Sequence, residues 1–423
     1  MNKIFNSIPL PTRAPDGEYD CGRGSYMLLW SDSSPDEFER LCGDITASGF
    51  RLFDRTDIEG SIHCTFAGKP VLHAWYCPCE RALRLTADPY TALYNTAPER
   101  CERKYGNTLW QFEVDHSLID CGMCYIVRCC DGSFFVIDSA HMYSVNDDIR
   151  IIEFLRKLNG GAKPTVAGWF FSHGHEDHVA KFSDILEFRS DEVDIETVYY
   201  NFPSYGQPDN EEWGECGKQV MHRFERELDK HPEIKKVRLH TGQRFFVRDL
   251  EFSVLCTHED IYPNPLSNFN DSSTAIMMTA GGCKVLFPGD CAAESDKVFL
   301  RRYHDALKCS VVQVSHHGHS GTSSEFYRRA GAECVLFPIT EIKFAEEWDK
   351  QEPNRVAVDI AKEYHIASNG TVEIPLPYSF GGTKRLPDET FEDFDGIFAL
   401  WCYEYTDEYK EKLRREFLER SKG

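Results

Sequence analysis

Polar and apolar positions in the first quarter of the chain predict one helix followed by short strands. Ser34-Pro35-Asp36-Glu37 places a capping serine before a proline and a glutamate, and this pattern predicts a helix that ends near Gly49. Alternating or aromatic runs, separated by turn residues, follow at 50–53, 61–66, 71–76 and 81–85. Such runs predict antiparallel strands. We therefore expect a small α+β accessory domain over residues 1–112.

A different pattern begins near residue 118. The runs 122–128 and 133–138 flank Cys130-Asp131-Gly132, which predicts a hairpin. Apolar runs then alternate with helical patterns, as expected when strands and helices form stacked α/β layers. The runs 324–330, 333–337, 355–363 and 370–374 predict a helix, a strand, a helix and a strand that complete a second half. We expect the main domain to cover residues 113–380 and a polar helical tail to cover 381–423.

Composition and cysteine usage indicate a soluble protein of the cytoplasm. The chain has 423 residues, of which 41% are hydrophobic and 27% charged, and it contains no apolar run of the roughly 18–20 residues that a membrane span needs. Its first residues contain no signal-peptide pattern. The 17 cysteines are an odd number and are scattered along the chain, which indicates reduced thiols. The close pairs Cys77/Cys79 and Cys121/Cys124 are weak candidates for a structural zinc site.

The net charge favours a small substrate over a nucleic acid. There are 69 acidic and 47 basic residues, which give a net charge of −22. Long-range repulsion from such a chain opposes the electrostatic attraction that supports non-specific nucleic-acid binding. We expect a small anionic substrate, no nucleic acid and no membrane as partners. The alternative is that the acidic excess serves solubility alone.

The strongest chemical signal follows the apolar strand 165–171. His173, His175, Asp177 and His178 come within six positions, and imidazole and carboxylate groups are suitable ligands for Zn²⁺ or a similar ion. A helical pattern begins at Val179, so the loop would be held between two rigid elements at the carboxyl end of a strand, where α/β sheets place their sites. The alternative is a polar loop that is rich in histidine by chance.

The strand 133–138 ends in Asp138, for which two roles are open. Its carboxylate would lie beside the histidine-rich loop and could orient a ligand histidine through a hydrogen bond. It could equally cap the helix that we expect to begin near Asp147.

Four motifs follow one another along the chain: His173-x-His175-x-Asp177-His178, Asn270-Asp271-Ser272-Ser273, Phe287-Pro288-Gly289-Asp290 and Ser315-His316-His317-Gly318. Together they resemble the metallo-β-lactamase-fold hydrolases, and the last three are similar to the hydrolase domain of the DNA-uptake competence channel proteins and their soluble relatives. The resemblance covers about residues 118–377 and implies a four-layer αβ/βα sandwich with a two-metal site between its halves.

The resemblance also implies a role for each motif residue. His317 would face the substrate and act in catalysis beside Asp177, and an exchange of roles between His316 and His317 is the alternative. The first ion lacks its usual third histidine, so either His258 or water would complete its shell. The implied metal ligands are His173 and His175 for the first ion, Asp177 and His178 for the second, Asp290 as the bridge, and His316 as the last ligand of the second.

These observations predict a metal-dependent hydrolase. Two divalent ions, zinc by first choice and manganese or iron as alternatives, would ionise a bound water near neutral pH and polarise the bond under attack. The resemblance also places His317, Asn270 and Ser273 near the site, where they would hold anionic oxygens or protonate a leaving group; the alternative is that these polar loop residues form turns. The branch resemblance implies a phosphoester or phosphodiester of a small molecule as substrate. The alternatives are a nuclease on single strands, a lactone or thioester hydrolase, and a metal-binding regulatory module without turnover.

Overall fold

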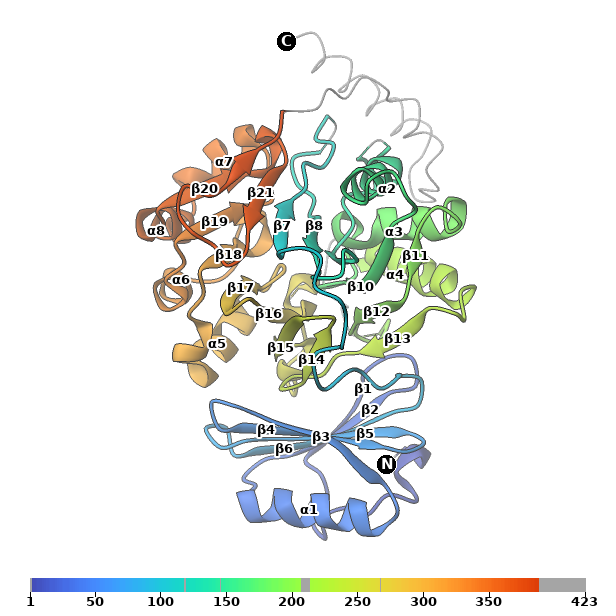
Figure 1. The fold of residues 1–423 in the computed structure, drawn as a ribbon. Helices are drawn as coiled ribbons and strands as arrows, with labels where there is room; N and C mark the ends of the chain where they lie inside the picture. The colour runs from blue at the N-terminus through green and yellow to red at the C-terminus, as the bar shows by residue number, and fades with distance from the viewer. Residues whose placement is uncertain (1, 118, 145, 207–213, 267, 388–423) are drawn as a thin grey trace.

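The computed structural model describes residues 2–117, 119–144, 146–206, 214–266 and 268–387. Three β-sheets organise the chain (Figure 1). Two of them face each other in a sandwich, and the third belongs to a separate N-terminal layer. No helix in the described ranges is long and apolar enough to cross a membrane.

The N-terminal unit is a six-stranded antiparallel sheet with one helix packed on it. Helix α1 (Pro35–Ala47) begins at the predicted capping box, in which Ser34 and Glu37 bond each other's backbone amides. Phe38, Leu41 and Ile45 of α1 are buried against the sheet. The strand order is β1-β2-β6-β5-β4-β3, and the strands are β1 (Gly17–Asp20), β2 (Tyr26–Trp30), β3 (Arg51–Ile58), β4 (Ser61–Ala67), β5 (Val71–Cys77) and β6 (Ala82–Asp88).

A nine-stranded mixed sheet forms one half of the sandwich. Its order is β13-β12-β10-β9-β8-β7-β21-β22, with β11 paired to β10. The predicted hairpin is β8 and β9, which pair antiparallel. The strands are β7 (Thr108–Gln111), β8 (Tyr125–Arg128), β9 (Phe134–Ile137), β10 (Thr165–Phe170), β11 (Asp194–Ile195), β12 (Thr197–Tyr200), β13 (Lys235–Arg238), β21 (Val372–Pro375) and β22 (Lys384–Arg385).

A seven-stranded sheet in the order β14 to β20 forms the other half. Its first four strands are antiparallel and its last four, from β17 onward, are parallel. The strands are β14 (Arg244–Val247), β15 (Leu250–Cys256), β16 (Ala275–Ala280), β17 (Cys283–Phe287), β18 (Val311–Gln313), β19 (Cys334–Phe337) and β20 (Glu363–Ile366).

Helices cover the outer faces of both sheets, which produces four layers (Figure 1). One apolar core lies between the two sheets, and a further core lies under the helices on each side. The predicted four-layer sandwich with a small N-terminal α+β unit is therefore confirmed. The helices are α2 (Asp147–Leu158), α3 (Glu176–Phe188) and α4 (Gly214–Asp229) on the nine-stranded sheet, and α5 (Ala293–Arg302), α6 (Ser324–Ala330), α7 (Glu341–Trp348) and α8 (Glu352–Ile360) on the seven-stranded side.

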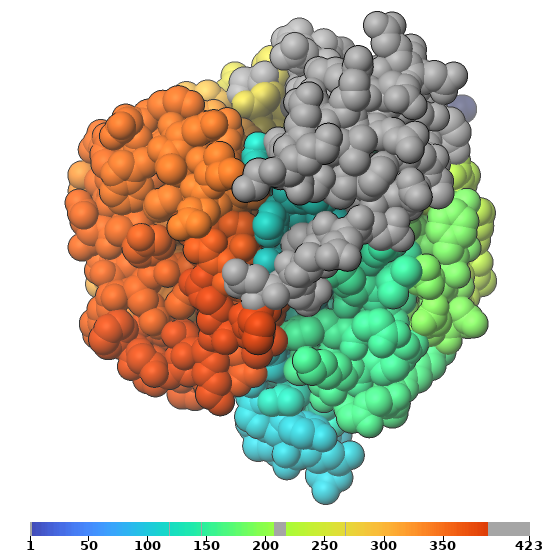
Figure 2. All heavy atoms as spheres, turned by 90° about the horizontal axis from the view of Figure 1, so that it is seen from above, coloured from blue at the N-terminus to red at the C-terminus, as the bar shows by residue number. Residues whose placement is uncertain are grey.

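The strand near the end of the described chain pairs differently from our expectation. We expected it to complete the second half, but β21 pairs antiparallel with β7 in the nine-stranded sheet. The same pairing places β7, which falls inside the predicted 1–112 unit, in the sandwich. Seen from above, the green residues and the orange-to-red residues lie side by side, with cyan residues between them (Figure 2). Most of the predicted tail (381–423) lies outside the described residues.

A buried charge cluster joins the N-terminal unit to the sandwich. Asp260 accepts hydrogen bonds from Arg84 of β6 and from Arg302 of α5. Both guanidinium groups also lie over the ring of Trp75, at 4.1 and 4.6 Å from its centroid. Because a buried carboxylate is stable only when it is paired, this contact fixes the unit against the sandwich.

Candidate metal centre

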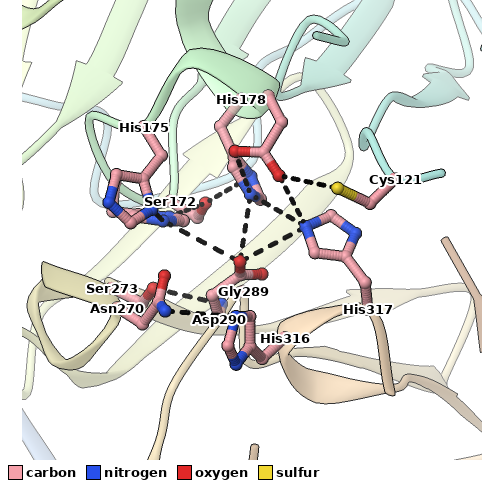
Figure 3. Close-up of polar contacts among 12 residues, drawn as sticks. Cys121, Ser172, His175, His178, Asn270, Ser273, Gly289, Asp290, His316 and His317 are labelled. Atoms are coloured by element: carbon pink, nitrogen blue, oxygen red, sulfur yellow. Dashed lines mark hydrogen bonds and ion pairs between the residues drawn. The ribbon is translucent and has the colours of Figure 1, made fainter. Parts of the chain in front are cut away.

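Loops from both sheets bring the predicted site residues together (Figure 3). The loop between β10 and α3 supplies His173 and His175, and the first turn of α3 supplies Asp177 and His178, because the helix begins at Glu176 and not at the expected Val179. Asp290 follows β17, and the histidine pair follows β18. The centre therefore lies at the carboxyl ends of strands, as expected for α/β layers.

Four of these residues place their donor atoms in one buried group. A donor atom from each of Asp177, His178, Asp290 and His317 lies within 4.8 Å of the others. His178 Nε2 and His317 Nε2 are each 3.3 Å from Asp290 Oδ2 and 3.3 Å from each other. His178 Nε2 also lies 3.5 Å from Asp177 Oδ1. None of the four residues is more than 8% exposed.

The spacing of these atoms fits a metal ion. Zinc bonds of about 2.0–2.1 Å to nitrogen and oxygen separate tetrahedrally arranged donors by roughly 3.3–3.4 Å, which matches the observed spacing. Asp290 Oδ1 is buried without a hydrogen-bond partner among the described residues, and an unpaired buried carboxylate oxygen is costly. Two imidazoles and two carboxylates form a common ligand set for a divalent ion.

The electrostatics of the group point in the same direction. Burial opposes a charge on His178, but Asp177, Asp290 and Asp138 outweigh it and hold the pKa of His178 well above its usual range. Burial likewise opposes a charge on His317, and Asp290 and Asp177 raise its pKa to about 10. The buried carboxylates therefore strongly stabilise a nearby positive charge. A divalent cation would supply that charge in place of the protons on His178 and His317.

His173 and His175 lie on the other side of Asp290. His173 Nε2 is 3.0 Å from His175 Nδ1 and 3.9 Å from Asp290 Oδ2. Burial, together with His178 and His175, holds the pKa of His173 well below its usual range, so its imidazole is neutral and can donate a lone pair. His173 thus lies between His175 and Asp290.

The structure places His317, not His316, against the carboxylates of Asp177 and Asp290. His317 Nε2 lies 2.9 Å from Asp177 Oδ2, whereas His316 Nε2 lies 3.1 Å from the Asn270 side-chain nitrogen. The sequence interpretation continued the alternation of β18 through His316, but both histidines have positive φ angles of 49° and 53°. This left-handed turn breaks the alternation, and we exchange the two roles in the proposal below.

Asp138 orients one of the central histidines. Its Oδ2 lies 2.7 Å from His178 Nδ1, and its carboxylate accepts hydrogen bonds from the Ser172 amide and hydroxyl, both at 2.8 Å. The first of the two open roles is thus confirmed, because a carboxylate at Nδ1 leaves Nε2 facing the centre. Helix α2 begins instead after Asn146.

Gly289 allows Asp290 to approach the loop after β10. It has a φ angle of 61°, and a Cβ atom at this position would lie 2.8 Å from Ser172 Cβ. Any side chain here would meet both strain and a clash. The Asp290 amide then donates to Ser273 Oγ at 3.1 Å, so the Gly-Asp sequence and Ser273 together place the shared aspartate.

Two residues lie where the sequence interpretation did not place them. His258, a candidate third ligand of the first ion, is hydrogen-bonded to Asn201 at 3.2 Å in a separate buried cluster with Glu259 and His240. Cys121, which we considered only for a structural zinc site with Cys124, has its thiol 3.7 Å from Asp177 Oδ2. No sequence signal connected Cys121 with this centre, because Cys121 lies in the connection between β7 and β8 and is 56 positions from Asp177 in the chain.

The chain was compared with known proteins by sequence and by structure. No family model and no curated protein matches it. Solved structures with a similar chain path include the metallo-β-lactamase fold protein YhfI from Bacillus subtilis, with 12% identity over 62% of this chain and 97% of that one and a TM-score of 0.39. Unliganded yeast PDE1 gives 10% identity over 64% and 99%, also with a TM-score of 0.39.

A diphosphatase from the PhnP family gives 15% identity over 55% of this chain and 86% of that one, with a TM-score of 0.33. Two more similar structures from Thermotoga maritima are described as a putative metallo-β-lactamase and as a putative zinc-dependent hydrolase of the metallo-β-lactamase superfamily. Identities and TM-scores of this size assign neither activity nor ligands. The resemblance to the competence channel hydrolases stays a prediction.

Proposed function

We propose that this protein is a two-metal hydrolase that acts on a phosphoester or phosphodiester of a small anionic molecule. The observation that carries the proposal is the buried group of Asp177, His178, Asp290 and His317, whose donor atoms have the spacing of zinc ligands. His173 and His175 would hold the first ion together with Asp290. Asp290 would be the shared ligand, because its carboxylate lies between the two sets of histidines.

When bound, a pair of divalent ions lowers the pKa of a water molecule and polarises the bond that it attacks. The residues of the chain provide the surroundings for this step. Asp138 holds the Nε2 atom of His178 toward the centre, and the carbonyl oxygen of Pro338 lies 2.7 Å from His317 Nδ1 and does the same for His317. Both imidazoles are thereby fixed before any ligand arrives, which lowers the cost of binding.

His316 and Asn270 form the substrate-facing pair in this proposal. The Nδ1 atom of His316 and the amide oxygen of Asn270 have no partner among the described residues, although both are buried. They would hydrogen-bond an anionic oxygen or the leaving group. The phosphoester class is supported by the order of the motifs, and the net charge of −22 favours a small molecule over a polynucleotide.

The test combines metal analysis with a substrate screen. We expect Asp290→Asn to lose metal and to lose turnover of chromogenic phosphomonoester or phosphodiester substrates while its circular dichroism spectrum is unchanged. Asp305→Asn, which removes an exposed partner of Lys308, is the control and should keep both. Turnover of lactones alone would refute the substrate class, and metal binding without any turnover would refute the enzymatic function.

A further inference from the structure

A separate group of side chains of the types that can bind metal lies on β19 and β20. Cys334 and Glu363 are direct partners in the parallel register of these strands, and His365 is two residues beyond Glu363. Alternate residues of a strand face the same side, so the three side chains share one face of the sheet. One donor atom from each lies within 4.8 Å of the others.

Buried polar atoms without partners mark this group. Both ring nitrogens of His365 and the Oε1 atom of Glu363 are inaccessible to solvent and make no hydrogen bond within the part of the chain that the structure describes. His365 as a whole is 9% exposed. Each such atom costs about 1–3 kcal/mol if it stays unpaired, and three of them in one place point to an occupant that pairs with them.

The chemistry of the three side chains selects the occupant. A thiolate, an imidazole and a carboxylate are ligands for Zn²⁺, whereas Mg²⁺ and Ca²⁺ prefer oxygen alone. Cys334 is a buried free thiol and is available as a ligand. We propose that Cys334, Glu363 and His365 bind a structural zinc ion that is separate from the candidate catalytic centre.

The location favours a structural role over a catalytic one. Cys334 and Glu363 are the first residues of β19 and β20, so the group lies at the amino ends of parallel strands. The candidate catalytic centre lies at the carboxyl ends, where the carbonyl oxygen of Pro338, just after β19, contacts His317. β20 is the edge of the seven-stranded sheet, and an ion would tie this edge to β19.

The ion would also support the segment that returns to the nine-stranded sheet. Thr383 donates a hydrogen bond to Glu363 Oε2 at 3.1 Å. Thr383, the last residue of the β21–β22 connection, therefore contacts the proposed zinc site.

The experiment measures zinc content and a spectroscopic signature in the full chain under reducing conditions. We expect Cys334→Ser and His365→Gln each to lose one zinc equivalent per chain relative to wild type. After replacement of zinc by Co²⁺, the near-ultraviolet absorption band of a cobalt–thiolate bond should be present in wild type and absent from Cys334→Ser. His231→Gln is the matched control, because it removes a histidine paired with an exposed glutamate, Glu233, and should change neither result.

The failure of this proposal is distinguishable from the failure of the proposed function. Asp290→Asn should keep the cobalt–thiolate band and the zinc equivalent of this site, whether or not the other centre binds metal. A band that persists in Cys334→Ser, or a zinc content that is equal in His365→Gln and wild type, would overturn the proposal. If Cys334→Ser does not fold, His365→Gln decides alone, through its zinc content and through loss of the zinc-dependent increase in Tm that wild type should show.

Discussion

The contact between Asp138 and His178 provides a sharp test of the candidate metal centre. Asp138 is fully buried and accepts three hydrogen bonds, from the Ser172 amide, the Ser172 hydroxyl and the His178 ring. Asparagine has the same shape but only one acceptor oxygen, and its NH₂ group must face at least one of these donors. Asp138→Asn therefore loosens the orientation of His178 without creating a cavity.

The expected effect on metal binding follows from the role of such partners. Loss of a carboxylate behind a ligand histidine lowers metal affinity by about 10–100-fold, which corresponds to roughly 1.4–2.7 kcal/mol. Competition with a chromophoric zinc chelator would measure this change directly. The assay needs no substrate, so it is independent of the reaction that the centre performs.

A matched control separates this effect from a general loss of stability. Asp296 also accepts hydrogen bonds from the amide and hydroxyl of one serine, Ser323, at 3.0 and 3.1 Å, but its hydrogen bonds involve no ligand histidine. Asp296→Asn should lower stability with unchanged zinc affinity. Equal zinc affinity in Asp138→Asn and wild type, or an equal loss in the two variants, would refute the reasoning.

Three further predictions address other parts of the molecule. His317→Ala should lower the metal content, whereas His316→Ala should keep the metal and lose turnover; elemental analysis and a turnover assay separate the two, and the opposite pattern would restore the original assignment. Asp260→Asn should destabilise the fold by about 3–5 kcal/mol in urea denaturation, because two buried arginines lose their shared partner, while the exposed change Asp305→Asn should cost nothing measurable. Burial opposes a charge on His240, but neighbouring carboxylates raise its pKa to about 9. Because a raised pKa stabilises the fold below the unfolded value near 6.5, the free energy of unfolding should fall by up to about 3 kcal/mol as the pH rises from about 6.5 to 9. The same fall in a His240→Gln protein would contradict this.

The sequence predicted the layers and most of the metal centre because both depend on local patterns. The capping box at Ser34 and the hairpin around Asp131 each lie within a few residues, and the structure has them as predicted. His173 to His178 lie within six positions and are therefore close in space, although α3 begins at Glu176, three residues before the predicted start, so that Asp177 and His178 lie in its first turn.

The features that the sequence did not predict depend on contacts between distant segments. The exchange of roles between His316 and His317 arises from a left-handed turn after β18, which the alternation of the strand did not predict. The Cys334 group depends on the register between β19 and β20, which only the folded sheet defines. The contact between the Cys121 thiol and Asp177 also joins two segments that are 56 positions apart in the chain.

The pairing of β7 with β21 has a consequence for biosynthesis. Trp110 donates a hydrogen bond to Glu373 across this pair, and the two residues are 263 positions apart in the chain. At ribosomal rates of about 5–20 residues per second, roughly 13–50 s pass between the synthesis of β7 and the synthesis of its partner β21. During this interval the nascent chain has an unpaired strand edge, and such edges can pair with other chains. A chaperone that covers β7 until β21 has left the ribosome would prevent this pairing.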